Sequence, residues 1–426
     1  MRALPDSEPH TRGCQTGAMG ADELERAYRA EATVLRATLA RRLGDVGLAE
    51  ELVQDAFVEA LEHWQTDGVP PNPGGWLTTT AWRKALDRQR RVKAGQEKLA
   101  LLAVTQDRSG ASAAALGEPE SEADDDLLSL VFACCHPALP ADSQVALTLR
   151  AVCGLTTAEI AAAFLVSEQA MGQRLSRARR ALRDEGVQVR IPEPDQLAER
   201  LAAVLAVVYL VFNEGYLASA GRTPARRDLA AQAVSLARLL HRLMPREPEV
   251  LGLLALLLFH ESRAAARFDG WGRLIRLADQ DRSRWDQSLA AEASALLDRG
   301  IALRDPGPYQ VQAAIAALHS AAADYSETDW QQIRLLYDRL QSMTPSPVVQ
   351  LNRAVATRYA IGPHEALAEV DPLAGELADY RLFHALRAEL LTAVGREADA
   401  RIANERALAL AANPAERDLI ARRLSG

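Results

Sequence analysis

Residues 155–182, LTTAEIAAAFLVSEQAMGQRLSRARRAL, decide the fold of this part of the chain. Thr156 and Glu159 have the spacing of a capping box, in which each side chain pairs with the backbone N–H of the other residue, so a short helix should start there. Residues 164–166 are predicted to form a turn, and Ser167 is a favourable N-cap for a second helix. Two helices joined by so tight a turn are typical of a helix-turn-helix.

The second of these helices is predicted to have one buried face and one exposed face. The buried stripe should comprise Val166, Ala170, Met171, Leu175, Ala178 and Leu182. The exposed face should carry Glu168, Gln169, Gly172, Gln173, Arg174, Arg177, Arg180 and Arg183. From Arg174 to Arg183 there are five arginines and no acidic residue. In a helix-turn-helix the leading residues of this helix reach base edges and later arginines reach phosphates, whereas an ordinary amphipathic hairpin is the alternative.

A second candidate contact with nucleic acid is Asn72–Lys93, NPGGWLTTTAWRKALDRQRRVK. Six cations and one acidic residue lie between Arg83 and Lys93, close to the indoles of Trp76 and Trp82. Cations that hold phosphates, beside indoles that can stack on unpaired bases, suit a single strand. The alternative is a solvated face of a helix.

Upstream, residues 48–61 (LAEELVQDAFVEAL) have the periodicity of an amphipathic helix. The apolar positions, which we expect in the core, are Leu48, Leu52, Val53, Phe57 and Leu61. The opposite face is expected to carry Glu50, Glu51, Gln54, Asp55 and Glu59. Taken alone, these polar residues indicate only a solvated face.

Composition limits the class of protein. The 426 residues are 48% hydrophobic, 25% charged and 5% aromatic, with a net charge of −8, so the chain does not bind nucleic acid through bulk basicity. The longest apolar runs, residues 201–212 and 250–259, are shorter than the about 20 residues that a bilayer span needs. We therefore expect a cytoplasmic protein without a membrane partner.

No signature of an enzyme or of a bound cofactor stands out in the sequence. Cys134, Cys135 and His136 lack the ligand spacing of a zinc site, so the two cysteines are expected to pack as small apolar residues beneath the helix-turn-helix. Neither a phosphate-binding Gly-rich loop with Lys nor a nucleophile–base–acid set is apparent. We predict no cofactor, no metal site and no enzymatic activity.

Helical periodicity runs along almost the whole chain, which predicts an all-α protein. Helices are expected at roughly 21–43, 47–64 and 74–93. The small and acidic residues up to Asp126 indicate a flexible linker. The polar stretch 1–19 is predicted to be a disordered leader, which leaves Met1 or Met19 as the start.

Beyond residue 194 the chain is predicted to be a helical repeat. Gly362 and Gly395 lie 33 residues apart, each between two helical stretches, and the second stretches carry Ala366 and Ala400. That spacing is typical of tetratricopeptide arrays, with an irregular helical domain as the alternative. Gly215, after an apolar helix, is expected to end that helix.

Three motifs follow one another along the chain, at residues 48–61, 72–93 and 155–182. In this order they resemble the sequences of alternative sigma factors of the extracytoplasmic-function class, in the subgroup with a long tetratricopeptide-like C-terminal extension. Two further stretches, FACCHPAL (132–139) before the helix-turn-helix and LVFNEGYLASAGRTPARRDLA (210–230) in the extension, contribute to the resemblance. It implies two small helical sigma domains joined by a linker, followed by a helical-repeat domain. The implied domains are a leader (1–19), region 2 (20–102), a flexible acidic linker (103–126), region 4 (127–187) and the extension (195–426).

The resemblance also implies roles for individual residues. Core RNA polymerase would be bound through its β′ clamp and β flap, with the clamp contacted by Glu51, Gln54 and Asp55. The −10 promoter element would be melted and held by Trp76, Trp82, Arg83, Lys84, Arg88 and Arg91. The −35 element would be read by Ser167, Glu168, Gln169, Gln173, Arg174, Arg177 and Arg180.

The main rival hypothesis is a helix-turn-helix regulator with a helical-repeat sensor, which does not replace the sigma subunit. It leaves the Trp- and Arg-rich helix near residue 83 unexplained. The extension is expected to fold back on the DNA-binding blocks and to regulate them, with a regulatory protein or a ligand as its partner.

Overall fold

The computed structural model describes residues 31–100, 120–164, 166–217 and 225–425. Within those ranges the chain is helical and contains no β-strand, as expected from its periodicity. The predicted leader (1–19), and the predicted linker up to residue 119, lie outside the described residues. The described residues form three segments: the N-terminal segment (31–100), the middle segment (120–187) and the extension (194–425).

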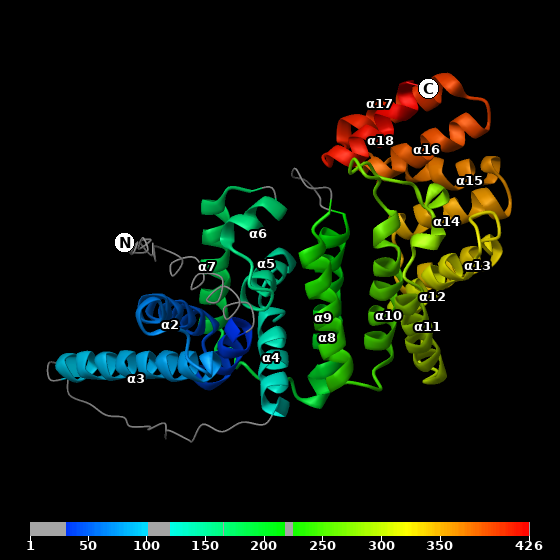
Figure 1. The fold of residues 1–426 in the computed structure, drawn as a ribbon. Coiled ribbons are helices and arrows are strands. Elements are labelled where there is room, and N and C mark those ends of the chain that lie inside the picture. The colour runs from blue at the N-terminus through cyan, green and yellow to red at the C-terminus, as the bar shows by residue number, and fades with distance from the viewer. Residues whose placement is uncertain (1–30, 101–119, 165, 218–224, 426) are drawn as a thin grey trace, which may run out of the picture.

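The N-terminal segment consists of a helix over residues 31–43, then α2 (Val46–Asp67) and α3 (Pro73–Ala100) (Figure 1). Helix α2 begins where the Asp45 carboxylate accepts hydrogen bonds from the N–H groups of Gly47 and Leu48, at 2.8 and 3.0 Å. Leu52, Val53 and Phe57 are buried as predicted. Leu61 is 42% exposed, so its expected place in the core was wrong.

The middle segment contains α4 (Glu120–Cys134), α5 (Ala141–Ala151), α6 (Thr157–Ala163) and α7 (Glu168–Asp184). The predicted capping box is confirmed, because the Thr156 N–H donates to the Glu159 carboxylate at 2.8 Å and the Glu159 N–H donates to Thr156 Oγ1 at 3.2 Å. Ser167 caps α7 by accepting from the Ala170 N–H at 3.2 Å. The helix-turn-helix is thus formed as predicted.

The buried stripe of α7 is largely the predicted one. Met171, Leu175, Ala178 and Leu182 are buried. Ala170, in contrast, is exposed, because it lies in the first turn of the helix on the side away from the core.

The prediction that the flexible linker extends to residue 126 was wrong, because its acidic end belongs to α4. From Glu120 onward these residues form the first turns of α4. Asp126 is fully buried and ion-paired with Arg41 of the N-terminal segment, and Asp124 pairs with Arg242 of the extension at 3.2 Å. Composition alone suggested a flexible stretch, but distant arginines hold these carboxylates in place.

The extension is a series of helices paired mostly with their neighbours in sequence, which curve away from the middle segment (Figure 1). Its first part contains α8 (Pro194–Tyr216), α9 (Arg227–Leu243), α10 (Pro248–Ser262), α11 (Gln287–Ala302) and α12 (Pro308–Ala321). Three short 3₁₀ turns lie between α10 and α11: η1 (Ala264–Ala266), η2 (Leu277–Asp279) and η3 (Arg282–Arg284). The second part contains α13 (Trp330–Met343), α14 (Pro347–Ala360), α15 (Pro363–Val370), η4 (Asp371–Ala374), α16 (Arg381–Ala393), α17 (Glu397–Leu410) and α18 (Pro414–Ser425).

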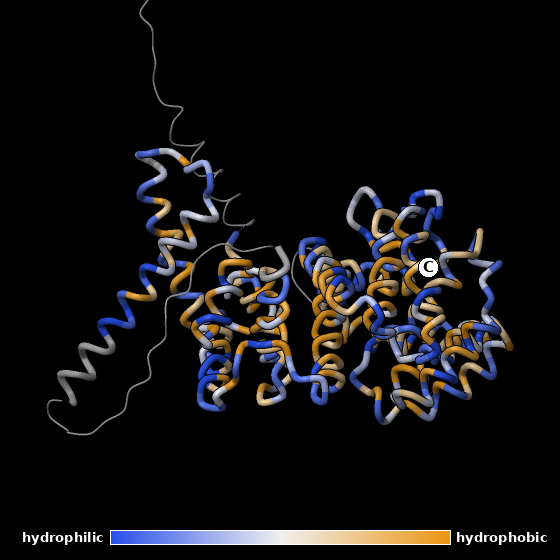
Figure 2. Tube along the Cα trace, turned by 90° about the horizontal axis from the view of Figure 1, so that it is seen from below, coloured by the Kyte–Doolittle hydropathy of each residue, from blue (hydrophilic) through white to orange (hydrophobic). Residues whose placement is uncertain are grey.

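The two glycines that suggested a repeat lie where expected, between consecutive helices of this second part. Gly362 separates α14 from α15, and Gly395 separates α16 from α17, where it adopts the left-handed φ of 78°. Ala366 and Ala400 in the second helices are buried. Apolar residues lie on the sides of the helices that face one another (Figure 2).

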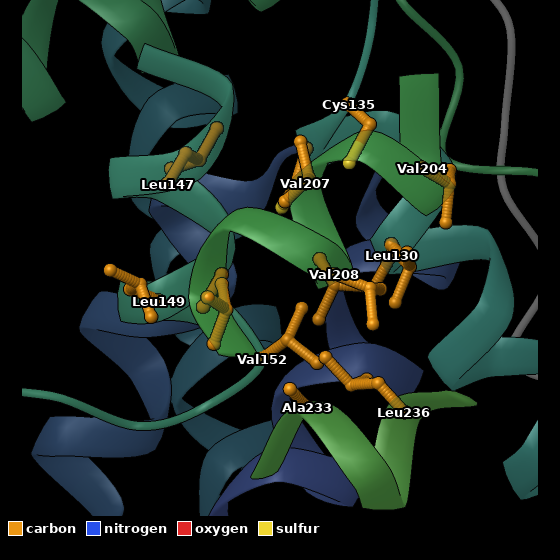
Figure 3. Packing of buried hydrophobic residues seen from close by; sticks show 14 of the residues in the cluster. Leu130, Cys135, Leu147, Leu149, Val152, Val204, Val207, Val208, Ala233 and Leu236 are labelled. Carbon is orange, nitrogen blue, oxygen red and sulfur yellow. The ribbon is translucent and has the colours of Figure 1, made fainter. Parts of the chain in front are cut away.

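One continuous apolar core joins all three segments. Where the extension meets the middle segment, α8 and α9 pack against α4 and α5, with Val204, Val207 and Val208 of α8 beside Leu130 and Cys135 (Figure 3). The cysteines are fully buried, as predicted. Cys135 is covered by α8 of the extension (Figure 3).

Helix α8 ends at Tyr216, so the helix end predicted near Gly215 is confirmed to within one residue, and Gly215 itself is a buried residue of the last turn. A Cβ atom on Gly215 would be 2.3 Å from the backbone nitrogen of Ala230 in α9. The Gly215 carbonyl also accepts a hydrogen bond from the Arg226 N–H at 2.8 Å. The glycine therefore permits the close approach of the two helices that hold the middle segment.

We predict that Gly215→Ala lowers the free energy of unfolding by about 1–3 kcal/mol, because backbone atoms must move to admit the methyl group. Gly270→Ala is the matched control, since no atom lies within 4 Å of its added Cβ, and it should change stability by less than about 0.5 kcal/mol. Urea unfolding of both variants tests this. Equal effects would show that the α8–α9 contact tolerates a side chain.

Candidate nucleic-acid and polymerase interfaces

Helix α7 presents an open polar face at its N-terminal end. Most residues predicted to read the −35 element are exposed, namely Ser167, Glu168, Gln169, Gln173, Arg177 and Arg180. Arg174 is the exception at 28% side-chain exposure, because its guanidinium lies 5.3 Å from the centre of the Phe164 ring and 3.7 Å from the Asp142 carboxylate. The face therefore offers amide, carboxylate and guanidinium groups on one rigid helix.

The tryptophans predicted to act at the −10 element are both half-buried in the N-terminal half of α3. Trp76 meets the ring of Trp64 edge-on, with 5.5 Å between ring centroids. The guanidinium of Arg42 lies 5.9 Å from the Trp82 ring centroid. One indole is thus held by another ring and the other by a cation, and each keeps some exposed surface.

The acidic face of α2 and the basic face of α3 neutralise one another. Arg88 donates to the Glu51 carboxylate at 2.6 Å, and Lys84 lies 2.8 Å from Glu59, which Arg83 also contacts. The hydrogen bond from Lys84, with further help from Arg83, lowers the pKa of Glu59. Exposed pairs of this kind stabilise a fold by no more than about 1 kcal/mol each, so they can exchange for other charged partners.

The remaining predicted residues of these two faces are open to solvent. Gln54, Asp55 and Arg91 are exposed, as is Glu51 despite its pairing with Arg88. The three residues predicted to contact polymerase therefore form one accessible patch on α2.

The prediction for Glu50 was wrong. It was expected on the solvated face, yet it is only 4% exposed. Its two carboxylate oxygens accept hydrogen bonds from Arg150 of α5 and Arg179 of α7. The spacing of Val46, Glu50, Val53 and Phe57 follows one helical stripe, and this was the signal in the sequence that Glu50 faces the core.

Other polar contacts join the same two segments around Glu50. Arg183 of α7 lies 3.3 Å from the Asp45 carboxylate. From the helix over residues 31–43, the Thr33 hydroxyl donates to the Val152 carbonyl at 3.2 Å, and Arg36 donates to the Ala151 carbonyl. A buried carboxylate that loses its partners is strongly destabilising, so these contacts hold the N-terminal segment firmly on the middle segment.

The extension is tied to the middle segment from the opposite side. Arg200 of α8 donates to the Phe132 carbonyl at 2.6 Å, and Arg226 lies 3.9 Å from the Glu159 carboxylate of α6. The middle segment, which carries the helix-turn-helix, is thus packed between the two others (Figure 1).

The buried cysteines are suited to packing. Burial raises the pKa of Cys135 to about 12, and it raises that of Cys134 as well, so both remain thiols at neutral pH. Within the described residues, no three His, Cys, Asp or Glu side chains gather in a way that could hold a metal ion. In that same part of the chain, no helix is long and apolar enough to cross a membrane.

Comparison with protein families agrees with this division into segments. Residues 27–94 match the model of sigma-70 region 2, and residues 129–182 match that of sigma-70 region 4. Residues 200–301 match a family of unknown function, DUF6596. The chain is therefore a sigma-70-type sigma factor with a helical C-terminal extension, a non-enzymatic transcription factor that binds core RNA polymerase and promoter DNA.

A relative is similar in sequence over most of its length. The uncharacterized protein R00370 of Rhizobium meliloti (strain 1021) is 46% identical over 380 residues, which cover 89% of each chain. The chain belongs to the same family as this relative. No solved structure is significantly similar to the chain.

We predict that Glu50→Gln lowers the free energy of unfolding by about 2 kcal/mol or more, because two arginines lose their buried counter-ion. The neighbouring Glu51→Gln serves as control and should cost less than about 1 kcal/mol, since its pair with Arg88 is exposed. Urea unfolding, together with hydrogen exchange at α2 and α7, measures the difference. Indistinguishable variants would contradict the importance of the buried contact.

Gly172 lies in the middle of α7, where a Cβ atom would come no closer than 4.0 Å to Thr157. Gly172→Ala should therefore raise the free energy of unfolding by about 0.5–1 kcal/mol through helix propensity, as measured by urea unfolding. A loss of stability would contradict this. The affinity of the same variant for duplex promoter DNA tells whether the glycine also permits close approach of the DNA backbone.

Proposed function

We propose that the chain is an alternative sigma factor of the extracytoplasmic-function class, which acts in the cytoplasm and directs core RNA polymerase to a specific set of promoters. The observation that carries the proposal is the exposed, arginine-rich face of α7 in the part of the chain that matches region 4. The short stretch between the matches to regions 2 and 4, residues 95–128, supports this class. The region 2 match also speaks against a regulator that leaves the sigma subunit in place.

The residue roles follow from position and exposure. The patch of Glu51, Gln54 and Asp55 on α2 contacts the β′ clamp, and the tryptophans and cations of α3 hold the melted −10 element. The exposed face of α7 reads the −35 element in the major groove, because a helix with free polar side chains at its start fits there. In each case the accessible surface supports the assignment.

We further propose that the packed arrangement is a closed form of the sigma factor. The −10 and −35 elements are about 25 base pairs apart, or about 85 Å of duplex at about 3.4 Å per base pair. Glu50, however, bonds directly to Arg179 of α7, so regions 2 and 4 lie in contact. Simultaneous binding of both elements requires that this contact breaks, and polymerase docking on α2 is the event that opens it.

The extension regulates this opening in our proposal. It packs on α4 and α5 through the shared core, so any movement of region 4 must either carry α8 and α9 along or expose apolar surface. The helical pairs of its second part support a tetratricopeptide-like repeat, and a protein or a small molecule that binds them would shift the balance between closed and open forms.

We predict that Arg177→Ala weakens transcription from a specific promoter by about 5- to 150-fold, which corresponds to about 1–3 kcal/mol for a lost base contact. Arg190→Ala, an exposed arginine beyond the end of α7, is the control and should have little effect. Run-off transcription with core polymerase measures both, on the native promoter and on one with a scrambled −35 sequence. If Arg177→Ala lowers transcription equally on both templates, then Arg177 contacts phosphates and reads no bases.

A further inference from the structure

A cavity of about 480 Å³ lies within the extension, where α10, α12, α13 and α14 converge. Sites for small organic molecules usually have volumes of about 300–1,000 Å³. The residues that line it are distinct from the polymerase and promoter residues assigned above.

Most of the wall is apolar or aromatic. It includes Leu256, Phe259, Ile315, Leu340, Val348 and Trp285. Trp285 is only 5% exposed, and its indole N–H has no hydrogen-bond partner within the described part of the chain. The indole therefore contributes its ring, and not its enclosed N–H, to the wall of the cavity.

A polar group of side chains lies in the same wall. Arg263 is the one permanently charged side chain among the described residues that line the cavity, and it donates to the Tyr216 hydroxyl at 2.8 Å. His319 Nδ1 lacks a hydrogen-bond partner in the described structure. Burial, together with Arg263 and Arg282, lowers the pKa of His319 to about 4, so at neutral pH its ring is uncharged.

A second cation lies close to this group. Arg282 donates to the His319 and Ala322 carbonyls, and its guanidinium lies 4.6 Å from the Trp285 ring centroid. His260, the other lining histidine, is also neutral at pH 7, because burial and the nearby arginines lower its pKa. Arg282 also interacts with Asp324 outside the cavity, so the positive charge of the cavity wall comes from Arg263.

We propose that this cavity binds a small organic anion, with a carboxylate or similar group attached to an aromatic or aliphatic body. The anionic group pairs with Arg263, and the body fills the apolar part of the cavity. In a site of low dielectric constant such a pair is stronger than in water. The apolar wall excludes a bare inorganic anion, and the cations exclude a metal ion.

The cavity is connected to region 4 through a single helix. Tyr209 of α8 lines the cavity, and Val207 and Val208 of the same helix pack against the middle segment (Figure 3). A bound molecule thus contacts the helix that holds region 4. The inference goes beyond the proposed sigma function, and binding can be measured without polymerase.

The test is isothermal titration calorimetry of the full chain with naphthylacetate and with its neutral analogue naphthylacetamide. Naphthylacetate should bind with a Kd on the order of 1 mM or tighter, as expected for a ligand of this size, and naphthylacetamide about tenfold more weakly. Arg263→Gln should weaken the binding of naphthylacetate by about tenfold and leave the binding of naphthylacetamide unchanged. Arg339→Gln, which replaces an exposed arginine outside the cavity, should match the unaltered chain.

A second variant tests the location of the site. Ala316→Leu on α12 places a larger side chain in the cavity wall and should weaken the binding of both compounds. Thermal melting checks that this variant remains folded. No binding of naphthylacetate at millimolar concentration overturns the proposal. So does binding that is equal for the acid and the amide, or that neither variant changes.

Discussion

The buried carboxylate of Glu50 is the constraint on which the arrangement of the sigma domains depends. An ionised carboxylate removed from water is tolerated only when it is paired and hydrogen-bonded, and both oxygens of Glu50 are used in this way. Because Arg150 and Arg179 come from different helices of region 4, the pairing defines how α2 lies against α5 and α7. It joins the region proposed to contact polymerase to the helix proposed to read DNA. The ion pairs of Glu50 therefore limit how far region 2 and region 4 can separate.

The extension completes this arrangement from the other side of region 4. Without α8 and α9, apolar residues of α4 and α5, including Leu130 and Cys135, would face solvent. Region 4 is therefore an inner layer between region 2 and the extension. The second half of the extension curves away and leaves surfaces for partners, while its first half contacts both the cavity and region 4. This geometry links a binding event in the extension to the position of the DNA-reading helix.

Local features of the fold could be predicted from sequence, whereas long-range features could not. The capping box of Thr156 and Glu159 and the Ser167 cap depend on residues within three positions, so their pattern was sufficient. Asp126 and Glu50 looked like solvated acids, because their partners, Arg41, Arg150 and Arg179, are far away in the sequence. The helix end near Gly215 could be predicted, but the close contact of Gly215 with Ala230 appears only when α8 meets α9. Periodicity predicted the exposure of most site residues of α2 and α7 correctly, and that of Glu50 wrongly, but it could not predict that regions 2 and 4 pack against each other.

The most direct test of the account is the distance between α2 and α7 before and after polymerase and promoter bind. Glu62→Cys and Ser176→Cys place spin labels on exposed positions of the two helices, in a chain whose Cys14 and half-buried Cys153 are replaced by Ser. Cys134 and Cys135 should resist labelling because their thiols are buried. Double electron–electron resonance should give a short distance between the two spin labels in the free chain. This distance should lengthen by several tens of ångströms in a complex that initiates transcription. An unchanged distance in a transcribing complex would contradict the closed-to-open account.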